Sequence, residues 1–128
     1  MASELKVNTL TGVSTAGSIA VTGEGNSTTT NLQQGLAKMW ANLDGTGTAA
    51  LDDSFNTSGL TDNGTGDFTV AINNDMSNAN YSCQFNGNSA HVGLTAIATG
   101  SLQVFVTAAN DSSQDVDPVT YLAHGDLA

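Results

Sequence analysis

Short segments in which hydrophobic and polar residues alternate recur along this chain, and turn-forming residues separate them. The clearest example is residues 58–72, SGLTDNGTGDFTVAI. At its middle, Asn63-Gly64 tolerates the positive φ angles of a tight turn. After this turn, apolar and polar residues alternate with a period of two. The pattern therefore predicts a β-hairpin over residues 60–72. One face of its second strand is expected to consist of Phe68, Val70 and Ile72.

Further strands are expected about every ten residues from residue 44 onward. Residues 101–108 give the strongest pattern, in which Phe105 faces away from a continuous apolar side. Either both faces of this strand are buried or Phe105 contacts another subunit, and we favour contact within a closed symmetric oligomer. Seven or eight short strands indicate an all-β fold, an antiparallel, jelly-roll-like β-sandwich. The other expected strands cover residues 49–55 (interrupted at Asp52-Asp53), 81–85, 94–98 and 119–124.

The first 34 residues differ from the rest because they hold too few apolar residues to bury much of themselves. Apolar and polar residues alternate near Leu5, and a second extended piece is expected at residues 18–21. Residues 1–34 are therefore predicted to form an extended N-terminal arm for attachment and oligomerisation, and residues 35–128 the β-sandwich domain. The expected interface residues are Leu5, Val7, Leu10, Ile19, Val21, Trp40 and Phe105.

Residues 32–43 fit two periodicities. Four positions fall at helical spacing: Leu32, Leu36, Met39 or Trp40, and Leu43. Thr30 is a candidate N-cap and Gly45 a candidate stop. The residues favour this helix and leave a strand open. In the strand, one side would carry Ala37, Met39, Ala41 and Leu43, and the other Leu36, Lys38 and Trp40.

The charge of the chain is strongly unbalanced. Its 128 residues carry 12 acidic side chains, two lysines (Lys6 and Lys38) and no arginine, for a net charge of −10. Because cations are needed to bind phosphate, neither nucleic acid nor an anionic membrane is an expected partner. An acidic exterior keeps a protein soluble and is tolerated where salt screens its self-repulsion. The apolar fraction of 39% is enough for one core.

Cysteine usage and the N-terminus indicate the compartment. Cys83 is the only cysteine, so no intrachain disulfide forms, and its alternation with Tyr81 and Phe85 predicts a small buried hydrophobe. The N-terminus lacks the basic and apolar regions of a signal peptide, and no segment reaches transmembrane length. We therefore expect synthesis in a cytosol without export by the general secretory route.

Candidate chemistry is limited to oxygen-rich loops. Residues 62–67 and 110–117 could offer Ca²⁺ ligands, but neither loop has the spacing of an EF-hand. His91 and His124 are too few for a zinc site. No acidic pair has a spacing that fixes two carboxylates across a sugar cleft. The sequence therefore predicts no catalytic, cofactor-binding or metal-binding residues. The acidic pairs considered are Asp52-Asp53, Asp62 with Asp67, and Asp115 with Asp117.

Seven segments, spread over nearly the whole chain, carry a resemblance to a known group. They are residues 1–10 (MASELKVNTL), 18–25 (SIAVTGEG), 35–48 (GLAKMWANLDGTGT), 53–56 (DSFN), 61–70 (TDNGTGDFTV), 76–81 (MSNANY) and 125–128 (GDLA). Together they resemble virion structural proteins of marine tailed phages (cyanophage-like and pelagiphage-like), in the group of tail-fibre and appendage β-sandwiches. The resemblance implies that residues 36–43 form a strand, which leaves the helix only for residues 32–35.

The same resemblance implies a non-enzymatic virion protein. We expect a trimeric surface appendage, a tail fibre or a capsid fibre or decoration, anchored to other capsid or tail proteins by its N-terminal arm. It would be made in the cytoplasm of a host bacterium and need no cofactor. The alternative is a glycan-binding adhesin domain for host recognition, with an aromatic such as Tyr81 in a surface loop. A capsid cement protein and a polysaccharide hydrolase are less favoured.

Overall fold

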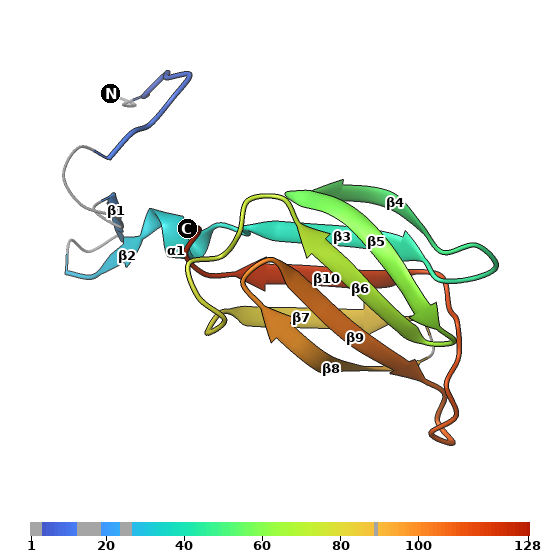
Figure 1. The fold of residues 1–128 in the computed structure, drawn as a ribbon. Coiled ribbons are helices and arrows are strands. Elements are labelled where there is room, and N and C mark those ends of the chain that lie inside the picture. Colours follow the sequence, from blue (N-terminus) through green and yellow to red (C-terminus); the bar gives the residue numbers. More distant parts are fainter. Residues whose placement is uncertain (1–3, 13–18, 24–26, 89) are drawn as a thin grey trace. The chain divides into compact units, whose positions relative to one another are not determined.

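The computed structural model describes residues 4–12, 19–23, 27–88 and 90–128, in a chain of two units, Met1–Gly35 and Leu36–Ala128 (Figure 1). In the first unit, β1 (Ala20–Thr22) pairs antiparallel with β2 (Thr29–Asn31), and one helical turn, α1 (Leu32–Gly35), follows. Residues 4–12 belong to no helix or strand. The extended piece expected at residues 18–21 is a strand from Ala20 onward, while Ser18 lies outside the described residues.

Residues 32–43, which fit two periodicities, divide between a helix and a strand. Only Leu32–Gly35 is helical, and its first turn is capped by Asn31 rather than Thr30, because the Asn31 Oδ1 accepts a 3.1 Å hydrogen bond from the Gln34 N–H. The favoured helix is wrong over residues 39–43. There Met39, Ala41 and Leu43 are at most 2% exposed on the inner side of a strand. Tertiary packing therefore overrides the helical spacing.

The second unit is an antiparallel β-sandwich, which confirms the predicted fold class. One sheet has the strand order β4-β3-β10-β7 and the other β5-β6-β9-β8. Figure 1 shows the two sheets stacked face to face. The strands are β3 (Met39–Asp44), β4 (Ala50–Phe55), β5 (Thr57–Gly64), β6 (Asp67–Ile72), β7 (Ser82–Gly87), β8 (His91–Ala98), β9 (Ser101–Thr107) and β10 (Val119–His124).

Strand pairing in the sandwich combines hairpins of consecutive strands (β3-β4, β5-β6 and β8-β9) with pairs between strands far apart in the sequence. The first and last strands of the unit, β3 and β10, pair in one sheet, and β6 and β9 pair in the other. Consecutive strands β4 and β5 lie in different sheets, joined only by Asn56. Asn56 adopts a φ of 55°, and its side-chain amide donates to the Lys38 carbonyl at 2.9 Å. This residue therefore makes the corner between the two sheets.

The predicted alternation of inner and outer side chains is confirmed on β6 and β9. On β6, Phe68, Val70 and Ile72 are at most 5% exposed, and the apolar side of β9 is fully buried. In the other sheet, Tyr121 and Phe85 pack edge to face with ring centroids 5.6 Å apart. Burying each such side chain contributes about 1.5–3 kcal/mol. The buried apolar set is Met39, Ala41, Leu43, Phe68, Val70, Ile72, Met76, Tyr81, Leu102, Val104, Val106, Val119, Tyr121 and Ala123.

The loop between β9 and β10, residues 108–118, crosses one end of the sandwich. There it forms hydrogen bonds with the turn after β3 and with the turn between β5 and β6. Its Val116 carbonyl accepts a hydrogen bond from Gly45 N–H at 3.0 Å, and the Asp115 carboxylate accepts one from Gly66 N–H at 2.7 Å. A Cβ at Gly45 would lie 2.7 Å from the Phe68 ring. The loop and the turns therefore approach at a distance that a side chain would prevent.

Candidate functional site

The outer face of the β4-β3-β10-β7 sheet carries a row of apolar side chains. Strand register places Trp40 beside Phe55 on β4 and beside Leu122 on β10. Trp40 is 36% exposed and Phe55 is 52% exposed, while Leu122 is half-buried. Neighbouring outward side chains in one row reinforce one another across strands, so this row is a continuous apolar strip on a solvent-facing surface.

The middle of this outer face holds no charged carboxylate or lysine, although the chain carries a net charge of −10. Acidic side chains start at its margin, where Asp53 lies opposite Asn42. Aromatic side chains without charges are typical of the centre of a protein interface. The uncharged outward residues are Trp40 and Asn42 on β3, Thr120, Leu122 and His124 on β10, and Ser82, Gln84 and Asn86 on β7.

Sequence reasoning missed Phe55 and Leu122 as surface residues beside Trp40. Along residues 49–55, simple alternation puts Phe55 on the same side as Leu51. A β-bulge at Asp52 reverses this, because Leu51 pairs with inward Leu43 whereas Phe55 pairs with outward Trp40. The interruption of the hydrophobic alternation at Asp52-Asp53 was the feature of the sequence that could have indicated the bulge. Leu122 could have been found from the period of two in β10.

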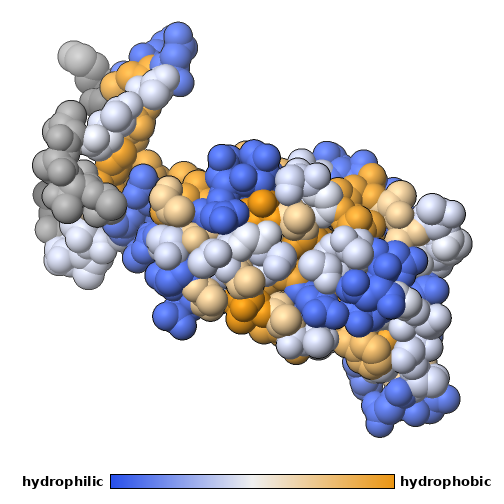
Figure 2. All heavy atoms as spheres, in the orientation of Figure 1, coloured by the Kyte–Doolittle hydropathy of each residue, from blue (hydrophilic) through white to orange (hydrophobic). Residues whose placement is uncertain are grey.

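Phe105 lies on the outer face of the other sheet and is 39% exposed, as its alternation predicted. It is opposite Asp67, whose carboxylate accepts hydrogen bonds from the Gln103 amide at 2.7 Å and the Asn63 amide at 3.2 Å. Figure 2 views this side of the sandwich, where residues of intermediate hydropathy predominate at the middle. Trp40 and Phe105 therefore face outward from opposite sheets and do not form one surface.

The candidate interface residues of the first unit are mostly exposed. Leu5 is 77% exposed, and Val7, Leu10 and Val21 are each between 51% and 56% exposed, while Ile19 is half-buried. The Lys6 ammonium lies 3.4 Å from the Glu4 carboxylate, with both side chains largely in solvent. Such an exposed pair contributes at most about 1 kcal/mol. None of the described residues of this unit is buried.

The acidic loops make hydrogen bonds that stabilise turns. The Asp62 carboxylate accepts from Gly64 N–H at 2.9 Å, and Asp44 accepts from both the hydroxyl and the N–H of Thr46, which lowers the pKa of Asp44. Desolvation, then repulsion from Asp44 and Asp52, raises the pKa of Asp117. Among the described residues, no three His, Cys, Asp or Glu side chains gather in a geometry that could hold a metal ion.

Tyr81, the aromatic considered for glycan contact, directly precedes β7, and its side chain is buried rather than exposed on the surface. It is 9% exposed, and its hydroxyl donates to the Ala98 carbonyl at 2.8 Å. The expectation is therefore wrong for this residue, because alternation with Cys83 and Phe85 turns its ring into the sandwich. Burial, with a smaller effect of Cys83, raises the pKa of Tyr81 to about 12.

Cys83 is half-buried against the core, as expected for a small hydrophobe, and burial raises the pKa of its thiol from 9.0 to about 11. At pH 8 we expect a thiol reagent to react about 100-fold more slowly with the native chain than with the unfolded chain, because the thiolate fraction falls in that proportion. Protonation of Cys83 also favours the folded state below pH 9, and this contribution is lost as the pH rises toward 11.

The control for this experiment is a Ser82→Cys substitution in a Cys83→Ala chain, because Ser82 is the exposed neighbour on the same strand. That thiol should react nearly as fast in the native as in the unfolded state. Equal rates for native and unfolded Cys83 would show that its thiol is solvated.

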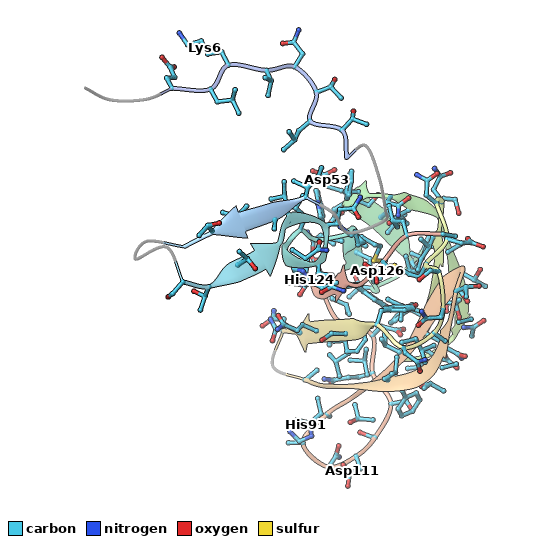
Figure 3. All side chains as sticks on the ribbon, turned by 90° about the vertical axis from the view of Figure 1, so that its left-hand side faces the viewer. Lys6, Asp53, His91, Asp111, His124 and Asp126 are labelled. Atoms are coloured by element: carbon cyan, nitrogen blue, oxygen red, sulfur yellow. The ribbon has the colours of Figure 1, made fainter. Side chains whose placement is uncertain are left out.

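The two histidines lie on strands of different sheets, His91 on β8 and His124 on β10. Figure 3 shows His91, with Asp111, on the side of the sandwich opposite Asp53. His124 is an outward residue of β10, paired in register with Ser82.

No helix within the described part of the chain has the length and apolar character needed to cross a bilayer. Comparison with protein-family models, curated proteins and solved structures gives no match to this chain.

Proposed function

We propose that this chain is a non-enzymatic structural protein of a phage virion, a trimeric surface appendage that is held in the particle by its N-terminal arm. The observation that supports it most directly lies in the first unit, where no described residue is buried and four apolar side chains are more than half exposed. Ordering such a segment costs conformational entropy, and the segment buries too little apolar surface of its own to offset that cost. It gains order by pairing with other chains.

The sandwich supports the same proposal through its outer surface. The apolar strip of Trp40, Phe55 and Leu122 has the composition of an interface centre and lies on the outer face of the sheet. Binding energy in such contacts comes from a few aromatic side chains that become desolvated. The acidic residues lie mainly in turns and at strand margins, where they do not oppose subunit contact through this face.

The oligomeric mass of the full chain tests the assembly. Three copies of the 13.0 kDa chain give a particle of about 39 kDa by native mass spectrometry or sedimentation equilibrium. Quantitative mass spectrometry of purified phage particles then tests the location, since a capsid decoration is present in many copies and a fibre in few. A 13.0 kDa monomer at micromolar concentration would contradict the proposal.

The exposed aromatic pair also favours a second candidate, a glycan-binding adhesin. Trp40 and Phe55 offer aromatic surface beside Asn42 and Thr120, whose amide and hydroxyl groups can bind sugar hydroxyls. A Trp40→Ala chain that keeps the oligomeric mass but loses binding on a glycan array would favour the adhesin. Loss of the oligomer itself would favour subunit contact.

A further inference from the structure

Strand β4 is an edge of its sheet. It pairs with β3 on one side, and no strand of the described chain lies on the other. A free edge presents backbone N–H and C=O groups that can accept another strand. Its outer side carries two acidic residues, Asp52 and Asp53, and no lysine lies on the strand. This edge is therefore suited to an extended segment that carries a positive charge.

The arm offers such a segment. Over residues 5–10, a period of two would put Leu5 and Val7 on one side and Lys6 on the other. Lys6 is the only basic side chain among the first 35 residues. Its contact with Glu4 is fully exposed, so exchanging that partner for another carboxylate costs little.

We propose that residues 5–10 of one copy add as a strand to the free edge of β4 in a second copy, with Lys6 against Asp53. This inference rests on the proposed function and names the contact that assembles the subunits. With Lys6 on the outer side, Leu5 and Val7 turn inward, toward the margin between the sheets. There Leu51 of β4 and Leu60 of β5 are only half-buried, and the added strand covers them.

The other sheet edges are less suited to this arm. β7 and β8 carry no acidic residue, whereas β4 carries two. β5 has two register shifts along its length, and β4 has one, at Asp52. The two aspartates on β4 also repel the β4 edge of another copy, so they select a cationic strand over self-pairing.

Disulfide trapping between two distinguishable chains tests this contact. In a Cys83→Ala background, a nitrogen-15-labelled full-length chain with Lys6→Cys is mixed with an unlabelled full-length chain with Asp53→Cys and oxidised mildly. A docked pair reacts at a high effective concentration, so we expect at least about tenfold more mixed disulfide than for the control. The control replaces Asp53→Cys with Gln84→Cys, an exposed outward residue on the opposite edge of the same sheet.

Equal yields for the Asp53→Cys and Gln84→Cys chains would overturn the proposed contact. The proposed contact would also be overturned if a single chain carrying both Lys6→Cys and Asp53→Cys formed an intramolecular disulfide at high dilution. If the chain still sediments as a trimer in either case, the structural role stands and only the site of arm docking fails. If the chain sediments as a monomer, both proposals fail.

Charge exchange gives a readout that loss of folding cannot reproduce. Lys6→Glu places a carboxylate against Asp53 and should weaken assembly about two- to fivefold for each arm contact. Adding Asp53→Lys to the same chain restores the opposite charges, and assembly should return to near the original dissociation constant. No recovery in the doubly substituted chain would contradict the pairing of these two residues.

Discussion

Replacing Gly66 with alanine lowers the free energy of unfolding by about 4 kcal/mol, because two separate costs add. Gly66 adopts a φ of 72°, which an alanine tolerates poorly. A Cβ at this position would also overlap the carbonyl oxygen of Val106. That carbonyl cannot move freely, since it accepts a 3.2 Å hydrogen bond from Gln114 N–H and the Val106 N–H donates to Gly66.

Gly47→Ala is the matched control for this substitution. Gly47 has a similar φ of 63°, but a Cβ there would meet no atom within 4 Å. We expect a loss of only about 1 kcal/mol, the cost of the backbone conformation alone. Urea unfolding followed by circular dichroism measures both values. Equal losses would mean that the β9–β10 loop does not close against this turn.

Replacing Phe68 with alanine also lowers the free energy of unfolding by about 4 kcal/mol, since a fully buried aromatic ring is removed from the centre of the core. The ring lies between the two sheets and reaches Gly45 in the turn after β3, where an added Cβ would be 2.7 Å from it. Its removal leaves a cavity that strands of both sheets must line.

Phe105→Ala is the control for the Phe68 substitution. Phe105 is the same residue type on the adjacent strand β9 but faces outward. At a concentration low enough to dissociate the proposed oligomer, we expect a loss below about 1 kcal/mol. Urea unfolding of the two variants therefore compares the inner and outer faces of one sheet. Similar losses would contradict the assignment of these faces.

Local pattern was sufficient to predict much of the sandwich. The hairpin of β5 and β6 combines turn residues with strict alternation in β6, and β9 and β10 alternate without interruption. The inner faces of β6, β9 and β10 therefore follow from the sequence. The segment that became β3 could not be assigned locally because its apolar residues fit a helix as well. Its conformation is decided by pairing with β10, about 80 residues further along the chain.

The candidate surface was predicted less completely, because it depends on which strands become neighbours. Trp40 and Phe105 were each expected to face outward, and both do. Alternation carries no information on sheet membership, so it did not place them on opposite sheets. Phe55 was missed because one bulge residue, Asp52, reversed its side of β4. The resemblance to phage virion proteins remains a prediction, since the fold alone does not determine a function.

The central claim is that each subunit buries the inner faces of its own sandwich while the arm finds its partners on neighbouring copies. Amide hydrogen exchange at residues 4–12, measured on the full chain at assembling concentration and after dilution to the monomer, tests it most directly. We predict exchange that is at least about tenfold slower in the assembled chain and rapid in the monomer. Exchange at the same rate in both states, whether slow or fast, would contradict the account.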